Sequence, residues 1–455
     1  MGFRDDFVWG AATASYQIEG AAYKDGKGLN IWDVFCRDPG KVYGDHNGDV
    51  ACNHYELYKE DVQQMKAMGL KAYRFSISWP RIMPEGKGKI NPKGIEFYSN
   101  LIDELLAAGI EPYVTLFHWD YPYELYIRGG WMNPDSVDWF AEYARVVVDA
   151  FSDRVTHFMT FNEPQCFIGL GHVTAEHAPA LKNPLTDTFL MAHHVLMAHG
   201  KAVQAMRAAA KQPIQIGYAP TGTMCYPKTN SPEDIEAARQ TLFACPEDAY
   251  RWSWNVSWWS DPVILGHYPE DGLKLYERWL PDMKPEDFKL MQQPLDFYGQ
   301  NIYNGTCMQA GPDGKPEYVD RYAGFPKTGC QWPVTPECLY WGPKFLYERY
   351  GLPIYITENG LSCHDVISVD GKVHDPNRID FLGRYLYELK KCAQDGTDIR
   401  GYFQWSLMDN FEWAKGYSER FGLIFVDYRT QERIWKDSAY WYKHLIETNG
   451  GELPR

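Results

Sequence analysis

The stretch THFMTFNEP, residues 156–164, is a short apolar run that ends in an asparagine, a carboxylate and a proline. A second run, LPIYITENG at residues 352–360, ends in a similar way, with Glu358 followed by an asparagine. A single glutamate at the end of a strand is usually only a solvated surface residue. Two of them raise the question of whether the fold brings Glu163 and Glu358 together.

Runs of this kind recur along the whole chain and alternate with amphipathic, helix-like segments. The eight strand-like runs are FVWGAAT (7–13), AYRFSISW (72–79), EPYVTLFHW (111–119), THFMTFNE (156–163), IQIGYAP (214–220), LDFYGQNIY (295–303), LPIYITENG (352–360) and IRGYFQWSL (399–407). Two of the segments between them, residues 54–70 and 95–110, carry a glycine just before the next run, which signals the end of a helix. Strands that alternate with helices favour βαβ units and a parallel sheet.

Eight strand–helix units predict an α/β protein built as a (β/α)₈ barrel, the TIM barrel. We expect residues 1–455 to form a single catalytic domain, with loop insertions at the C-terminal face of the strands. Neither a linker nor a low-complexity segment interrupts the chain. An open, doubly wound sheet is the alternative, but no GxGxxG motif follows an early strand, so a dinucleotide-binding version has little support.

The composition excludes several classes of partner. The chain has 455 residues and a formal net charge of −15, which argues against nucleic acids and anionic membrane surfaces because both attract basic proteins. No run of 18 apolar residues predicts a membrane span, and the first residues lack the pattern of a secretory signal. The ten cysteines form no CxxC pair, which is typical of reduced thiols in a cytoplasmic protein. A monomer and a homo-oligomer are both compatible with this composition.

Polar and aromatic side chains gather at the predicted strand ends, where a barrel of this type carries its active site. They are Gln17, Arg74, His118, Trp119, Asn162, Glu163, Asn301, Tyr303, Glu358, Asn359 and Trp405. Such a set suits a sugar, because amides, imidazoles and carboxylates bind hydroxyl groups while indole rings cover the C–H faces of the sugar ring.

The two glutamates fit glycoside hydrolysis, which needs two carboxyl groups on either side of the scissile bond. One must be protonated so that it can give a proton to the leaving oxygen, and the other must be ionised. Arg74, at the end of the second run, could hold one of them ionised, and Tyr303 could donate a hydrogen bond to it. A separation of about 5–5.5 Å would make the ionised group a nucleophile and the reaction a retaining one.

Four motifs then identify a family. They are YRFSISWPRI (73–82), TFNEP (160–164), YITENG (355–360) and NFEWAKGYSERFGL (410–423). With them the chain resembles glycoside hydrolase family 1, the family of retaining β-glucosidases, over nearly its whole length. The resemblance implies a TIM barrel that needs no cofactor and acts on a small-molecule glycoside or an oligosaccharide.

The resemblance also implies roles for individual residues. Glu163 would be the general acid/base, and Glu358 the nucleophile that forms a glycosyl-enzyme. The supporting residues would be Arg74 beneath the carboxylates, Asn162 on the sugar 2-hydroxyl, Tyr303 on Glu358 and Asn301 beside it. The residues implied to bind the sugar are Gln17 and His118 on the side of the 3- and 4-hydroxyls, Glu412 and Trp413 on the 3-, 4- and 6-hydroxyls, Trp405 as the stacking floor, Phe421 near C6, and Trp119.

The same resemblance bears on the substrate. Family members that cleave 6-phospho-β-glucosides lack the glutamate of FEW and carry a lysine and a tyrosine in the loop that reads SERFG here. This chain has Glu412, Glu419 and Phe421 instead, which favours an unphosphorylated sugar. Plant thioglucosidases have glutamine in place of Glu163, so an O-glycosidase is expected. We expect β-D-glucosides to be substrates, and β-galactosides and β-fucosides to be further ones.

Several positions depart from the family pattern. Gln165 stands after NEP, where tryptophan is common, and Cys166 follows it. Tyr121 and Tyr123 stand where leucine and glutamine are commoner, and Trp332 lies in an unusual context. These positions are expected on the side of the leaving group, the aglycone, so the leaving-group preference is where this chain should differ from its family.

Other functions remain open at this point. They are a transglycosylase with the same chemistry, a 6-phospho-β-glucosidase (which Glu412 disfavours), a non-catalytic sugar-binding homologue and a metal-dependent barrel hydrolase. The histidines HVTAEH (172–177), HH (193–194) and His199 match neither HExxH nor a Cys/His ligand spacing, so we predict no metal site.

Overall fold

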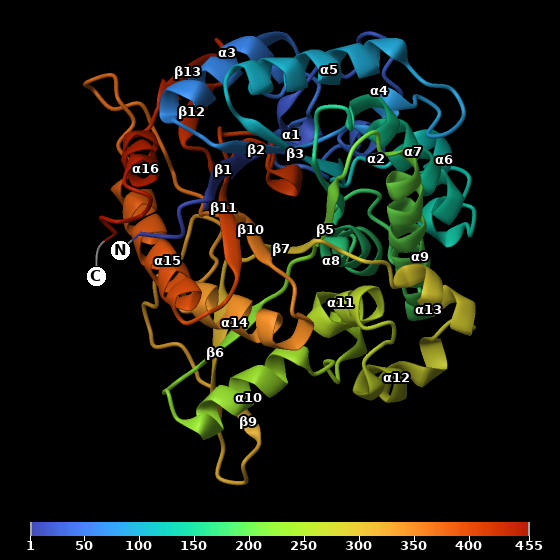
Figure 1. Ribbon diagram of the computed structural model, residues 1–455, viewed down its shortest axis with the longest axis vertical. Helices are drawn as coiled ribbons and strands as arrows, with labels where there is room; N and C mark the ends of the chain where they lie inside the picture. Colours follow the sequence, from blue (N-terminus) through green and yellow to red (C-terminus); the bar gives the residue numbers. More distant parts are fainter. Residues whose placement is uncertain (1, 454–455) are drawn as a thin grey trace.

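The computed structural model describes residues 2–453, and its centre is a closed barrel of eight parallel strands (Figure 1). The order round the barrel is β1, β2, β3, β4, β5, β7, β10 and β11, and β11 closes on β1. The bounds are β1 (Val8–Ala12), β2 (Ala72–Ser76), β3 (Glu111–Phe117), β4 (His157–Asn162), β5 (Gln215–Ala219), β7 (Phe297–Asn301), β10 (Ile354–Asn359) and β11 (Ile399–Trp405). Each predicted run contains one of these strands, so the predicted (β/α)₈ barrel is confirmed.

The strands end earlier than the sequence pattern predicted. Strand β2 ends before the end of the run at residues 72–79, because Trp79 already begins the short helix α4 (Trp79–Ile82). Strand β3 likewise ends before Trp119, whose backbone is left-handed with φ 78°. The prediction that Arg74 ends its strand is wrong, because Arg74 lies in the middle of β2 and therefore deeper in the barrel.

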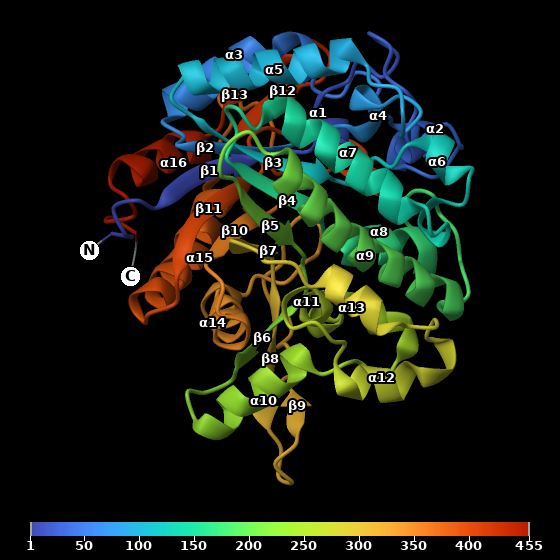
Figure 2. The same cartoon turned by 45° about the vertical axis from the view of Figure 1, so that its right-hand side comes forward.

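Helices surround the barrel on its outside, as Figures 1 and 2 show. The longer ones are α3 (His54–Met68), α5 (Pro92–Ala107), α7 (Ser136–Phe151), α9 (Leu185–Ala209), α14 (Cys338–Tyr350), α15 (Pro376–Gln394) and α16 (Asp437–Glu447). Their ends follow local signals: Asn91 caps the start of α5 by accepting a hydrogen bond from the backbone N–H of Lys93, and α3 ends at Gly69 with φ 81°. No helix within residues 2–453 has the length and apolar character that a bilayer crossing requires.

Insertions follow the C-terminal ends of the barrel strands. After β5 and β7 the chain adds a three-stranded sheet, and after β11 it adds an antiparallel pair. These strands are β6 (Met224–Pro227), β8 (Gly305–Ala310), β9 (Pro316–Tyr318), β12 (Ile424–Asp427) and β13 (Glu432–Trp435). The shorter helices are α1 (Ser15–Ile18), α2 (Ile31–Phe35), α6 (Tyr123–Tyr126), α8 (Pro164–Ile168), α10 (Pro232–Phe243), α11 (Val256–Ile264), α12 (Glu270–Tyr276) and α13 (Pro285–Met291). In Figure 2, α10 and β9 form the end of the molecule opposite α3 and α5.

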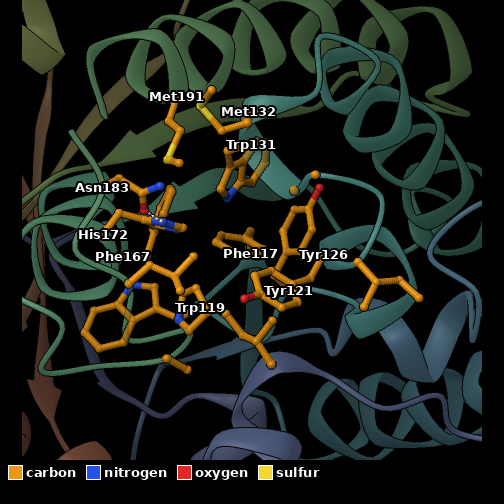
Figure 3. Close-up of a pocket in the computed structure, with 17 residues that line it drawn as sticks. Phe117, Trp119, Tyr121, Tyr126, Trp131, Met132, Phe167, His172, Asn183 and Met191 are labelled. Atoms are coloured by element: carbon orange, nitrogen blue, oxygen red, sulfur yellow. Dashed lines mark hydrogen bonds between the residues drawn. The ribbon is translucent and has the colours of Figure 1, made fainter. Parts of the chain in front are cut away.

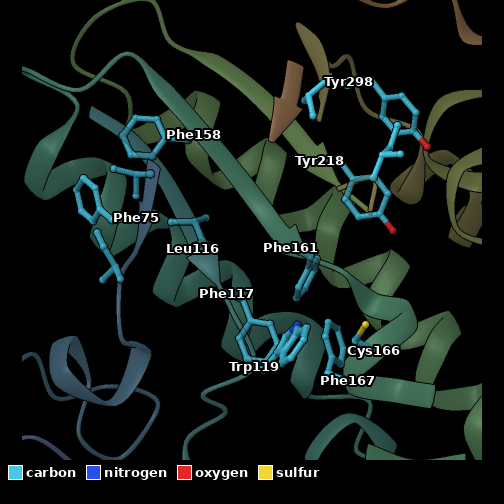
Figure 4. Packing of buried hydrophobic residues seen from close by; sticks show 14 of the residues in the cluster. Phe75, Leu116, Phe117, Trp119, Phe158, Phe161, Cys166, Phe167, Tyr218 and Tyr298 are labelled. Carbon is cyan, nitrogen blue, oxygen red and sulfur yellow. The ribbon is translucent and has the colours of Figure 1, made fainter. Parts of the chain in front are cut away.

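Side chains fill the barrel beneath the strand ends. Tyr113 of β3 stacks on His157 of β4 with ring centres 4.2 Å apart, and it packs against Phe403 of β11 at 4.9 Å. A larger apolar cluster lies between strands and helices, and Figure 4 shows part of it, including Phe75, Leu116 and Phe158 from three neighbouring strands. The aromatic floor gives the residues above it a rigid, water-poor base.

A buried ionic network holds the loops that follow β10 and β11. Lys436 is fully buried and donates to Asp365 Oδ2 and to Asp409 Oδ1, both at 2.6 Å. Arg378 also donates to Asp365, at 2.8 Å, and Arg420 donates to Asp409, at 2.6 Å. Because Asp409 lies just after β11, the network anchors the loop that follows this strand.

We expect Lys436→Met to lower the free energy of unfolding by about 3–5 kcal/mol, because it leaves two buried carboxylates without their shared cation. Urea denaturation measures this change. Lys93→Met is the matched control, since Lys93 pairs with Glu96 on the surface and its side chain is 60% exposed, so little change is expected there. Equal losses in the two variants would contradict the structural role of the network.

Candidate active site

The two glutamates do meet, through a network of hydrogen bonds at the barrel mouth. Glu163 follows β4 and Glu358 lies in β10, and they are 6% and 3% exposed. Asn301, the last residue of β7, donates to Glu163 Oε1 at 2.7 Å and to Asn162 Oδ1 at 2.9 Å. Arg74 donates to Glu358 Oε1 and to Asn162 Oδ1, both at 2.6 Å. These contacts connect both carboxylates to the guanidinium group of Arg74. Glu358 bonds it directly, and Glu163 is connected through Asn301 and Asn162.

The backbone of Glu163 is left-handed, with φ 45° and ψ 69°. Pro164 disfavours the right-handed helical region for the residue before it, and it occupies the first position of α8, where its missing N–H is harmless. The N–H of Glu163 donates to the carbonyl of Ala219 in β5 at 2.9 Å. The proline and this hydrogen bond together fix the direction of the carboxylate at the mouth of the barrel.

Glu358 is surrounded by groups that favour its charged form. Burial raises the pKa of its carboxyl group, while the Arg74 cation and the hydroxyl of Tyr303 oppose that rise. Tyr303 donates to Glu358 Oε2 at 2.7 Å, and Arg74 holds the other oxygen. Glu358 is therefore the carboxyl group of the pair that ionises first.

Glu163 has the opposite surroundings. Burial, followed by the negative charge of Glu358, raises the pKa of Glu163 to about 8. Hydrogen bonds from Asn301 and from Cys166, whose Sγ lies 3.0 Å from Oε2, oppose this rise only in part. No lysine or arginine within residues 2–453 forms an ion pair with Glu163. Burial and the charge of its neighbour therefore favour the protonated form of Glu163 at neutral pH.

The aromatic residues expected to bind the sugar pack against one another in one group. His118 lies parallel to both Trp405 and Trp413, with ring centres 5.6 and 5.9 Å apart, and Trp119 packs on Trp413 at 4.5 Å. Phe421, 2% exposed, lies beyond Tyr303. Flat apolar faces of this kind suit the C–H faces of a sugar ring.

Four buried polar atoms in and around this pocket have no hydrogen-bond partner among the described residues. They are Gln17 Oε1, His118 Nδ1, Glu412 Oε2 and Glu419 Oε2. Because buried polar atoms are nearly always paired in proteins, these atoms are positioned for the hydroxyl groups of a ligand. The amide nitrogen of Gln17 is fixed by donating to the Phe411 carbonyl at 2.8 Å, which leaves its oxygen free to accept.

Burial favours the neutral forms of two of these residues, His118 and Glu412. Burial and the charge of Arg74 hold the pKa of His118 well below its usual value, so the ring is neutral. Its Nε2 accepts from Asn162, which leaves the proton on Nδ1 as a free donor. Burial and the charges of Glu358, Glu419 and Glu163 raise the pKa of Glu412 to about 8, so at neutral pH it too is a donor.

The residues expected on the aglycone side do not all face the pocket. Trp332 packs against Tyr303 at 5.2 Å and is partly exposed at the rim, and Cys166 contacts the acidic side chain of Glu163. Gln165 is fully buried, and its amide bonds both the N–H and the C=O of Thr221, so it offers no free group to a ligand. The expectation for Gln165 is therefore corrected to a structural role.

Sequence reasoning missed two threonines that support the network. Thr357 donates to Asn301 Oδ1 at 2.6 Å, and Thr115 accepts from Arg74 Nε at 3.1 Å. The available signal was a polar residue inside an otherwise apolar strand, which needs a buried partner. Glu419 also borders the site, although the sequence argument used it only to disfavour a phosphate.

The histidines considered as metal ligands bond other groups. The ring nitrogens of His193 lie at hydrogen-bond distance from Tyr268 and Asp287, and His199 Nδ1 lies 2.7 Å from Thr160 Oγ1. No group of three or more possible ligands capable of holding a metal ion occurs in the part of the chain that the structure describes.

Comparison with known proteins identifies the family of this chain. A family model described as "Glycosyl hydrolase family 1" matches residues 1–451, and the chain belongs to this family. It is 44% identical to "Beta-glucosidase A" of Thermotoga maritima over 99% of both chains, and 44% identical to "Beta-glucosidase A" of Acetivibrio thermocellus over 98% of this chain and 99% of the relative. The solved structure of the Thermotoga maritima β-glucosidase with glucoimidazole superposes with a TM-score of 0.90 at 44% identity, covering 98% of this chain and 99% of that one.

We expect kcat/KM for an aryl β-glucoside to fall as the pH rises through about 8, because the proton that Glu163 must give to the leaving group is then lost. A pH–rate profile measures this. In Glu163→Gln, assayed with a reactive leaving group, the alkaline limb should disappear. Glu337→Gln removes another carboxyl group with a raised pKa outside the site, so that variant should keep the limb. An unchanged limb in Glu163→Gln would rule out Glu163 as its source.

Proposed function

We propose that this protein is a retaining β-glucosidase that releases terminal, non-reducing β-D-glucosyl residues by double displacement. The observation that carries the proposal is the contrast between two buried carboxyl groups: Glu358 bonds Arg74, whereas Glu163 has a pKa of about 8 and no cation of its own. Paired carboxyl groups with different protonation states are what this reaction needs. The β-glucosidases among the relatives support the same activity.

In the first step, Glu358 attacks the anomeric carbon while Glu163 gives its proton to the departing oxygen, and an ester between Glu358 and the sugar forms. The ester carries no charge, so the electrostatic cause that raised the pKa of Glu163 disappears. Glu163 can then act as a base towards water, which attacks the ester and releases the sugar. The same side chain thus changes role because its neighbour changes charge.

The remaining residues hold the sugar. Asn162 is fixed by Arg74 and Asn301, so its amide group can meet the 2-hydroxyl. The free atoms of Gln17, His118 and Glu412 would bind the hydroxyls at the 3-, 4- and 6-positions. Binding at O4 through side chains that can accept or donate tolerates either configuration there, so β-galactosides and β-fucosides are proposed as further substrates. Trp405, Trp413 and Trp119 would supply the apolar walls, with Phe421 near C6, and Trp332 and Cys166 would border the leaving group.

An unphosphorylated sugar fits the charges better than a 6-phosphosugar. Glu412 and Glu419 present carboxyl oxygens on this side of the pocket. The guanidinium of Arg420, in the same loop, is already bonded to Asp409 and to the Val426 carbonyl. A phosphate there would meet these acidic groups, and Arg420 would not be free to offset its charge.

We also propose a cytoplasmic location and a single catalytic domain. All ten cysteines are free thiols, which supports a reducing compartment. The family match from residue 1 to residue 451 supports one catalytic unit.

Intact-mass measurement after incubation with a 2-deoxy-2-fluoro-β-glucoside that carries a good leaving group tests the proposal. The fluorine slows the second step, so the wild-type protein should gain the mass of one fluorosugar. Glu358→Gln should gain none, because its amide cannot form the ester.

Glu419→Gln is the matched control, a second acidic residue at the site that should still be labelled. Labelling of Glu358→Gln would show that another residue is the nucleophile. No label on the wild type, together with no binding of the sugar analogue deoxynojirimycin (which occupies a solved Thermotoga maritima relative), would reject a glucose-binding site.

A further inference from the structure

A second cavity lies beside the sugar pocket, and none of the site carboxylates lines it. Its volume is about 420 Å³, within the range of small-molecule sites. Its walls come mainly from β3 and the loop after it, from α8, from the segment between α8 and α9, and from α9, and they are mainly apolar with several aromatic rings (Figure 3). Ile127 and Leu181, which are 59% and 37% exposed, lie where the lining reaches the surface.

One polar atom of the lining is left without a partner. The hydroxyl of Tyr121 is buried and forms no hydrogen bond to any described residue, although the residue is only 2% exposed. Tyr121 is also one of the positions where the sequence departs from its family, which commonly has leucine there. A leucine would remove this hydroxyl group, so the chain has placed an unpaired hydrogen-bonding group in the wall of the cavity.

A second polar group of the lining is a neutral histidine. His172 Nδ1 lies 3.1 Å from Asn183 Oδ1, as the dashed line in Figure 3 marks. Burial lowers the pKa of His172 to about 4, so at neutral pH Nδ1 carries the proton and Nε2 is an acceptor. The cavity therefore combines a hydroxyl group and an imidazole acceptor with aromatic walls.

The lining contains no charged side chain, since no Asp, Glu, Lys or Arg contributes to it. An anion or a cation would lose its hydration there without gaining a partner. Few polar side-chain groups belong to this lining, namely those of Tyr121, Tyr126, Trp131, His172 and Asn183, so a sugar with many hydroxyl groups fits it poorly. A flat, neutral aromatic molecule with a single hydroxyl group matches both the walls and the polar atoms.

The cavity is linked to the catalytic residues through two of its walls. Trp119 belongs to both sites: it packs on Trp413 in the sugar pocket, and its Nε1 donates to the carbonyl of Asn162 at 3.0 Å. Phe167 of the lining lies on α8, the helix that Glu163 precedes directly. We propose that this cavity is a second ligand site, which takes a neutral phenol or naphthol beside the occupied sugar pocket.

Calorimetric titration of the full-length protein with 2-naphthol, in the absence and in the presence of saturating deoxynojirimycin, tests the proposal. One equivalent of naphthol should bind with the same affinity in both cases. Tyr121→Phe removes the unpaired hydroxyl and should weaken binding about tenfold, the effect of one hydrogen bond. Leu181→Trp at the cavity mouth should weaken it at least as much.

Leu275→Trp is the matched control, because Leu275 is similarly exposed at 42% but lies on α12 away from the cavity. It should bind naphthol like the wild type, and retained deoxynojirimycin binding shows that each variant is folded. Loss of naphthol binding when deoxynojirimycin is present would place naphthol in the sugar pocket and overturn the proposal. The proposal would also be overturned if neither Tyr121→Phe nor Leu181→Trp changed the affinity for naphthol, or if naphthol did not bind at all. Failure of deoxynojirimycin alone to bind would count against the glucosidase proposal and leave naphthol binding as an independent result.

Discussion

The ion pair between Arg74 and Glu358 is the interaction on which the rest of the site depends. Arg74 is 1% exposed, and its guanidinium group bonds Thr115, Asn162, Glu358 and the carbonyl of Thr357. A buried cation is tolerated only when its donors are satisfied in this way. Because Arg74 contacts one glutamate and not the other, it makes two chemically identical side chains different. The charge that it stabilises on Glu358 then helps to keep Glu163 protonated.

The same electrostatics extend to the sugar pocket. Glu412 has no cation beside it and lies near three other carboxyl groups, so its pKa is raised to about 8. With Glu163 and Glu412 protonated, the site carries less negative charge than its number of carboxyl groups suggests, and both groups can donate hydrogen bonds. A ligand hydroxyl that donates to Glu412 favours the ionised form, so binding of a sugar can shift this balance. Protonation in the pocket is therefore coupled to binding as well as to chemistry.

Periodicity and motifs predicted the eight barrel strands and brought Glu163, Glu358 and Arg74 into one site, because strand patterns are local and the barrel places all strand ends together. They could not predict the left-handed backbones of Glu163, Trp119 and Trp413, which tertiary contacts impose. They also misplaced Arg74 at a strand end, since an apolar run does not show where regular pairing stops. Gln165 was misread for a similar reason: its partner, Thr221, lies far away in sequence.

Two of the departures from the family pattern lie apart from the Arg74 network, whereas Cys166 donates a hydrogen bond to Glu163. Tyr121 lines the second cavity and Gln165 pairs with Thr221, and neither bonds a residue of the network. Both lie on or near elements that meet α8, which starts directly after Glu163. Glu358 and Arg74 lie on strands β10 and β2, whose pairing in the barrel leaves little freedom, and Tyr303 follows β7 closely. Changes around α8 can therefore alter the surroundings of the leaving group while the Arg74–Glu358 ion pair stays fixed. For this reason, bond cleavage and leaving-group preference are separable in this fold.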